Sequence, residues 1–127
     1  STGLEDFNLD WLAGFGTDGY EPADVQATLA ELTARSVALH IRKHAPGASR
    51  MFVCGGGASN RHLVERLAAN LPETRVGSTR EVGLDPDWVE AVAFAWLAMR
   101  TTRKQPGNLP SVTGASRKVV LGTIHSP

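Results

Sequence analysis

Three consecutive glycines constrain the fold of this chain more than any other feature of its sequence. A short apolar run at residues 52–54, Phe-Val-Cys, leads into the glycines at 55–57, and a helical pattern follows them. This order predicts a strand, a tight turn and the start of a helix. Glycines at such a turn permit positive φ and leave backbone N–H groups open to a ligand. Because the helix start adds partial positive charge, the turn suits a phosphate or another anion.

Composition and charge narrow the class of protein. The chain has 127 residues, enough for one modest domain, and 13 Lys and Arg balance 13 Asp and Glu to a net charge of +0. This balance argues against nucleic acid or a membrane surface as a partner, since proteins that bind either usually carry a basic excess. No apolar run approaches the ~20 residues of a membrane helix, and the N-terminus lacks the pattern of a signal peptide. The single cysteine, Cys54, excludes an internal disulfide and favours a cytoplasmic location.

Apolar spacing and end signals predict the helices and strands. The helical segments are residues 8–15, a long helix from Pro22 to about His44, residues 60–71 with Ser59 or Asn60 as N-cap, and a helix that Asp85 and Pro86 open and that continues through 88–99. Strands are predicted at 50–54, 74–78 and 118–124, and a loop at 105–114.

The apolar faces of these helices indicate how they pack. The long helix is expected to turn one stripe inward, and the next helix another; the stripes are Val25, Leu29, Leu32, Ser36 and Leu39, then Leu63, Val64, Leu67 and Leu71. The helix at 88–99 is apolar on most faces, which indicates burial on several sides. Such burial needs another layer, two or three short strands make a poor sheet alone, and the sequence does not begin with Met. We therefore expect an α/β fold with a small sheet flanked by helices, in the C-terminal part of a larger protein.

The glycine turn has a structural and a functional interpretation. It can be a plain strand-to-helix corner, or Gly55, Gly56 and Gly57 can cradle a nucleotide or phosphate. A Walker A loop is excluded, because Ala-Ser follows Gly57 in place of Lys and Ser or Thr. A dinucleotide fingerprint fits poorly, since Asn60 stands where its third glycine belongs.

Among the titratable residues, Glu90 is the main candidate for a site. It lies one turn into an apolar helix, where a carboxylate is either exposed on a narrow polar stripe or held in a site with a partner. His40 and His44 are four residues apart and could face one way as a metal pair, but no third ligand is evident, so we predict no metal site. Cys54, at the end of an apolar strand, is by default a small buried thiol.

Further motifs occur in a fixed order along the chain. After the glycine segment at 52–63, residues 83–95 fit Gly-x-Asp-x-Asp-x-x-Glu-Ala-x-x-Phe-Ala. Residues 107–115 then fit Gly-Asn-x-Pro-x-x-Thr-Gly-Ala, and Val-Leu-Gly follows at 120–122. Together with the start of the chain, which includes Ser1 to Gly3, these segments resemble the C-terminal part of anhydro-N-acetylmuramic acid kinases, a family of actin-like sugar kinases. The resemblance covers nearly the whole chain.

The resemblance implies a two-lobed actin-like (ribonuclease H-like) ATPase or kinase fold, with residues 1–127 in its C-terminal lobe. It implies ATP and Mg²⁺ as cofactors and 1,6-anhydro-N-acetylmuramic acid as substrate. The anhydro bond is hydrolysed and O6 is phosphorylated, which gives N-acetylmuramic acid 6-phosphate in peptidoglycan recycling. By this resemblance Gly55, Gly56 and Gly57 would contact the nucleotide, Asn60 would donate to it from the helix start, and Glu90 would hydrogen-bond the sugar or the attacking water. A homodimer is implied as well.

The same resemblance implies parts that this sequence lacks. The family's phosphate loop and its aspartate general base are expected in an N-terminal part of the same protein, which is thus an expected partner. Because phosphoryl transfer depends on positioning and electrostatics, we predict that the 127-residue chain alone is inactive. Other interpretations stay open: another actin-like sugar or acyl kinase, a non-catalytic actin-like nucleotide-binding module, and a plain structural α/β module.

Overall fold

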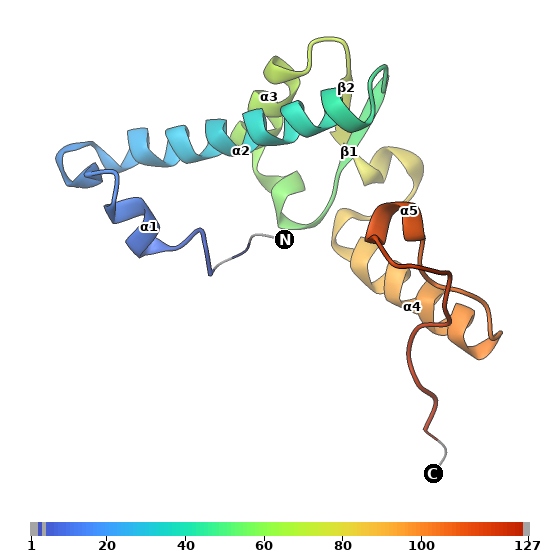
Figure 1. The fold of residues 1–127 in the computed structure, drawn as a ribbon. Helices are drawn as coiled ribbons and strands as arrows, with labels where there is room; N and C mark the ends of the chain where they lie inside the picture. Colours follow the sequence, from blue (N-terminus) through green and yellow to red (C-terminus); the bar gives the residue numbers. More distant parts are fainter. Residues whose placement is uncertain (1–2, 4, 126–127) are drawn as a thin grey trace. The chain divides into compact units, whose positions relative to one another are not determined.

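The computed structural model describes residue 3 and residues 5–125, which form two compact units. Unit 1 contains the described residues up to Met51 together with Asn60–Gly77, and unit 2 contains Phe52–Ser59 and the described residues from Ser78 onward. Figure 1 labels the helices and strands in chain order. The part of the resemblance that rests on Ser1 and Thr2 lies outside the described residues.

Unit 1 is built on two helices that pack against each other, α2 (Pro22–His44) and α3 (Arg61–Asn70) (Figure 1). Before them come α1 (Leu9–Ala13) and the 3₁₀ turn η1 (Thr17–Gly19). The predicted helices at 8–15, 22–44 and 60–71 are thus confirmed. Their end signals also act as expected, because Pro22 begins α2 and the side chain of Asn60 caps α3.

The core of unit 1 lies between α2 and α3. Ala34 and Ala38 on α2 are fully buried, and Leu67 on α3 is 3% exposed. The predicted inward stripe on α2 was wrong in part, because Leu32 and Leu39 are 48% and 61% exposed. The two alanines form the contact face since small side chains let α3 approach closely, whereas larger residues would hold it away. On α3 the predicted inward residues are buried or half-buried; they are Leu63, Val64, Leu67 and Leu71.

A polar network joins α2 to α3 beside this core. Glu31 accepts hydrogen bonds from Arg66 Nε at 2.6 Å, from Arg35 Nε at 2.7 Å and from Asn70 Nδ2 at 3.2 Å. These donors, Arg66 first, lower the pKa of Glu31 from 4.5 to about 2. The carboxylate therefore fixes the position of α3 along α2. Packing of small apolar side chains alone would not determine this position.

Strands β1 (Arg50–Val53) and β2 (Arg75–Ser78) form a parallel two-stranded sheet, with α3 between them in the sequence. This confirms both predicted strands. The backbone bond from the N–H of Arg75 to the carbonyl of Ser49, at 2.9 Å, sets the register and pairs Arg75 with Arg50. Beside it, Thr74 Oγ1 donates to the carbonyl of Ala48 at 2.8 Å. Each bond joins residues 26 positions apart.

Unit 2 is made of short turns and two helices. Its elements are the 3₁₀ turns η2 (Gly55–Ser59), η3 (Thr79–Val82) and η4 (Pro86–Trp88), then α4 (Val89–Thr102) and α5 (Pro110–Thr113). The third long helix was predicted to open at Asp85 and Pro86, but that segment is a 3₁₀ turn and α4 begins at Val89. The Asp85 side chain explains this, because it accepts from the N–H of Asp87 at 3.1 Å and holds a tight turn there.

The predicted final strand at 118–124 was wrong. No strand is assigned there, although the N–H of Gly107 donates to the carbonyl of Val119 at 3.0 Å. The amide of Asn108 makes the next two bonds, to the carbonyl of Arg117 at 3.0 Å and from the N–H of Val119 at 2.7 Å. A side chain thus takes the place of a neighbouring strand and holds this segment as irregular chain.

Helix α4 differs from its predicted burial. None of its residues is buried, and Val92, Phe94 and Trp96 are between 48% and 66% exposed. Its apolar surface is therefore not covered by the residues that the structure describes. Among the described helices, none combines the length and the hydropathy that a bilayer crossing requires.

Candidate functional site

The glycine turn leaves β1 and folds at once into η2. Gly55 has a φ of +64°, in the left-handed region that glycine adopts without steric cost. A Cβ added to Gly55 or to Gly56 would meet nothing within 4 Å. The space above these two glycines is therefore open, and a ligand can approach their backbone directly. The cradle interpretation of the turn fits this geometry.

Within unit 2, the glycine turn η2 contacts η4, the 3₁₀ turn that precedes α4. Asp85 organises this second turn: besides its bond to Asp87, it forms an ion pair with Arg80 Nη2 at 2.9 Å, and its carbonyl accepts from the N–H of Trp88 at 3.0 Å. The first aspartate of the 83–95 motif is thus a structural residue, and Asp87 follows it on an exposed position.

Glu90 lies in the first turn of α4, two residues after η4, and is exposed. Its carboxylate has no hydrogen bond or ion pair with the residues that the structure describes. Of the two sequence interpretations, the exposed polar stripe describes Glu90 in this structure. A carboxylate without such a partner is also free to accept from a ligand hydroxyl or water.

Asn60 belongs to unit 1, whereas the glycines and Glu90 belong to unit 2. Its Oδ1 accepts from the N–H of Leu63 at 3.0 Å and so satisfies one of the otherwise unpaired donors at the start of α3. This is the N-cap role that the sequence predicted for Asn60, and the glycines themselves form η2 before it. The side-chain oxygen Oδ1 of Asn60 is thus engaged in the cap, and the side-chain nitrogen Nδ2 is the atom that could donate to a ligand.

The histidines lie apart from this region, on the last turns of α2. The rings of His40 and His44 stack with centroids 6.0 Å apart, and His40 Nδ1 hydrogen-bonds the carbonyl of Ser36 at 2.8 Å. Within residues 3 and 5–125, no three His, Cys, Asp or Glu side chains come together as a metal site would require. Cys54 is exposed, which corrects the expectation of a buried thiol.

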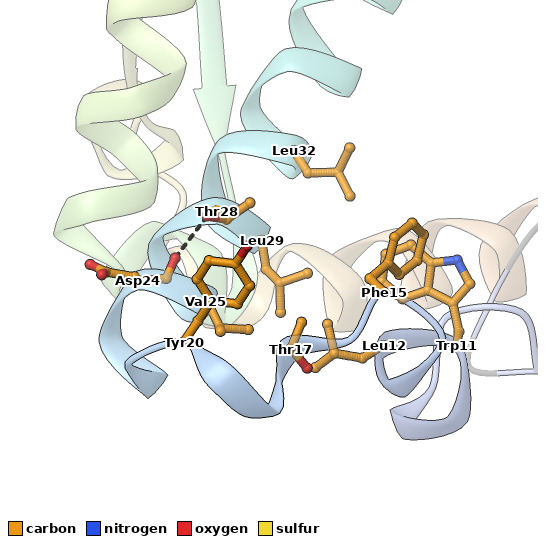
Figure 2. A pocket seen from close by; sticks show the side chains of 10 residues that line it. All are labelled: Trp11, Leu12, Phe15, Thr17, Tyr20, Asp24, Val25, Thr28, Leu29 and Leu32. Carbon is orange, nitrogen blue, oxygen red and sulfur yellow. Dashed lines mark hydrogen bonds between the residues drawn. The ribbon is translucent and has the colours of Figure 1, made fainter.

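A hollow of about 420 Å³ lies in unit 1, between α1, η1 and α2 (Figure 2). Figure 2 shows Trp11 and Phe15 on one side and Val25 and Leu29 on the other, and the Trp11 and Phe15 rings meet edge to face at 4.9 Å. The lining is almost entirely apolar, and its Thr28 hydroxyl is already bonded to the carbonyl of Asp24 at 2.8 Å. The hollow offers apolar contact surface and no group suited to phosphate chemistry.

Comparison with known proteins decides the family. The family model described as "Anhydro-N-acetylmuramic acid kinase" matches residues 1–127. The chain belongs to this family. Curated proteins of the same name include those of Coxiella burnetii strain Dugway (52% identical over 126 residues), Thiobacillus denitrificans (51% over 129) and Saccharophagus degradans (48% over 130).

These matches also show how much of the family's length the chain represents. They cover 98% to 100% of this chain but only 34% or 35% of the length of each relative. The chain therefore spans about a third of the anhydro-N-acetylmuramic acid kinases it matches, and it is part of a longer protein. The expected place of this third, in the C-terminal part, stays a prediction.

Proposed function

We propose that this chain is the C-terminal part of an ATP-dependent kinase that acts on 1,6-anhydro-N-acetylmuramic acid. The enzyme would hydrolyse the 1,6-anhydro bond and phosphorylate O6, in cytoplasmic recycling of peptidoglycan. Two observations support this: the family match over residues 1–127, and the contact in unit 2 between the glycine turn and η4. The contact carries the proposal, because it places a bare backbone beside the segment that leads into Glu90.

The glycines supply the nucleotide side of the proposed site. The open space above Gly55 and Gly56 fits a group that lies against the peptide backbone, as a ribose or phosphate does. When bound, ATP supplies the phosphoryl group and Mg²⁺ offsets the charge of its phosphates. We assign no Mg²⁺ ligand to this chain. Gly57, the third glycine of the turn, and the amide nitrogen of Asn60 complete the proposed nucleotide contacts.

We assign Glu90 to the part of the proposed site that binds the sugar. Its exposed carboxylate can accept a hydrogen bond from a sugar hydroxyl or from the water that attacks the anhydro carbon. Accepting from that water would orient its lone pair toward the carbon. Glu90 is thereby assigned to the hydrolytic half of the reaction.

The remaining two thirds of the protein would supply the family's phosphate loop and its aspartate base, in a two-lobed actin-like fold that forms a homodimer. Phosphoryl transfer requires both sides of the cleft, so the 127-residue chain alone is expected to show no sugar phosphorylation. Steady turnover by the purified chain would contradict this.

The test is a mass-spectrometric assay of the complete protein with ATP, Mg²⁺ and the anhydro sugar. We expect a product heavier by one water and one phosphoryl group. Glu90→Gln weakens acceptance from the sugar or the water and should lower the rate by roughly 100-fold, a usual effect of misplacing a reacting group. Glu73→Gln is the matched control, because Glu73 is also exposed but lies in unit 1, and it should leave the rate unchanged.

Other results of this assay would support other functions of the protein or other roles for Glu90. A folded protein that binds ATP but phosphorylates a plain hexose in preference would be another actin-like kinase. ATP binding with no turnover of any sugar would indicate a non-catalytic module. Equal rates for Glu90→Gln and Glu73→Gln would remove Glu90 from the site and leave the kinase proposal standing.

A further inference from the structure

One buried hydroxyl beside the glycine turn has no partner. Thr79 Oγ1 is the buried side-chain polar atom that makes no hydrogen bond with the residues the structure describes. Burying a hydroxyl without a partner costs stability, so such atoms in folded proteins usually have a role. Thr79 has no distinctive sequence pattern, because it is a single threonine that follows a strand.

The surrounding turn holds this residue firmly. Thr79 is the first residue of η3, directly after β2, and its carbonyl accepts from the N–H of Leu84 at 3.1 Å. Ser78 caps the turn by accepting from the N–H of Arg80 at 3.2 Å, and Gly83 closes it with a φ of +81°. The backbone of Thr79 is thus fixed by its neighbours, and the missing partner of its side chain does not result from a loose segment.

The sheet register places Thr79 at the edge where the glycine turn begins. In a parallel ladder, the bond from the N–H of Arg75 to the carbonyl of Ser49 pairs Arg75 with Arg50. The same offset at the carboxyl ends of the strands pairs Ser78 with Val53 and puts Thr79 opposite Cys54, one strand spacing of ~4.8 Å away. Gly55 directly follows Cys54, and both strand ends belong to unit 2. Ligands of open α/β sheets bind outside the carboxyl ends of the strands, which is where Thr79 lies.

We infer that Thr79 is a nucleotide-binding residue whose hydroxyl hydrogen-bonds an oxygen of the bound ATP. This rests on the proposed function, which places the nucleotide on the glycine turn. A hydroxyl can donate to a phosphate oxygen and exchange bonds with a ribose hydroxyl, so it matches either part of the nucleotide next to the backbone. In the ligand-free protein this hydroxyl has no hydrogen-bond partner, and the bound nucleotide provides one.

The test is isothermal titration of the complete protein with MgATP, for the wild type, Thr79→Val and Thr79→Ser. Valine keeps the shape without the hydroxyl, so we expect affinity to fall about 10-fold, as for one lost hydrogen bond to a charged group. Serine keeps the hydroxyl and should bind within about threefold of wild type. Thr33→Val is the matched control, because the Thr33 hydroxyl bonds the carbonyl of Leu29 at 2.9 Å on the exposed side of α2, in unit 1.

Melting temperatures without ligand complete the test. Since valine removes an unpaired buried hydroxyl, the ligand-free Thr79→Val protein should melt no lower than the wild type. A clear fall would show that the whole protein already pairs this hydroxyl and would overturn the inference. Wild-type affinity in Thr79→Val would overturn it while the proposed function stands. A folded wild-type protein that binds no MgATP would overturn both.

Discussion

Two neighbouring glycines separate the folding role of the turn from its ligand-binding role. Gly55 has a φ of +64°, whereas the φ of Gly56 lies outside the left-handed region, and a Cβ on either would meet nothing within 4 Å. Gly55→Ala therefore changes backbone energy alone, since no neighbouring atom is displaced. Gly56→Ala changes neither backbone strain nor packing, and it adds a methyl group only where a ligand would lie.

The magnitudes follow from these conformations. A left-handed alanine costs about 1–2 kcal/mol, so Gly55→Ala should be destabilised by up to that amount. Alanine at an unstrained position restricts the unfolded chain, so Gly56→Ala should be unchanged or stabilised by up to about 1 kcal/mol. Both substitutions restrict the unfolded chain equally, so this term cancels, and their difference of roughly 1–2 kcal/mol reports the backbone conformation.

The assay is urea unfolding of the complete protein, followed by titration with MgATP. We expect a lower unfolding midpoint for Gly55→Ala than for Gly56→Ala, with little change in slope. Affinity for MgATP should fall at least 10-fold in Gly56→Ala, whose fold is intact. Equal midpoints would refute the conformational argument, and wild-type affinity in Gly56→Ala would refute close approach of the nucleotide to the turn.

Three further predictions concern the parts that hold the site's scaffold. Because the pKa of Glu31 is lowered from 4.5 to about 2, its hydrogen bonds stabilise the fold above pH ~4.5, and this stabilisation is lost as the pH falls toward 2. Glu31→Gln should therefore flatten the curve of unfolding free energy against pH in that range, and an unchanged curve would contradict this. Leu67→Ala should cost about 2–5 kcal/mol in urea unfolding, since Leu67 is 3% exposed, and a cost under 1 kcal/mol would show that α3 is not packed as described. Asn60→Asp keeps the cap on α3 but removes the amide donor, so the unfolding midpoint should hold while MgATP affinity falls; equal affinity would exclude Asn60 from the nucleotide site.

The sequence predicted the elements whose signals are local. Pro22 begins α2, the Asn60 side chain caps α3, and β1 ends just before the glycines, because each of these signals acts within a few residues of the chain. The turn at Asp85 was misjudged for a related reason. The same side chain that can cap an α-helix can also hold a 3₁₀ turn, and the choice depends on the Arg80 ion pair and on contact with η2.

Residues of the candidate site could be predicted from the sequence only where their residue type has few structural roles. Consecutive glycines are rare enough to mark a close approach to the backbone, and Gly55 confirms the need for positive φ. The Thr79 hydroxyl carries no such mark, because its lack of a partner depends on the register of two strands that α3 separates. The bonds of Asn108 to residues 9 and 11 positions away are equally invisible to local patterns.

Helix α4 shows why burial could not be predicted from periodicity. Its residues are apolar on most faces, yet Phe94 is 66% exposed and Trp96 is 48% exposed. An apolar side chain predicts that some surface will cover it, and the sequence does not say whether that surface lies in the same segment. Since the chain spans about a third of the length of its relatives, most of the surface available to α4 in such a protein is outside these residues. The apolar pattern of α4 therefore cannot be interpreted from these residues alone, since the described part of the chain leaves it uncovered.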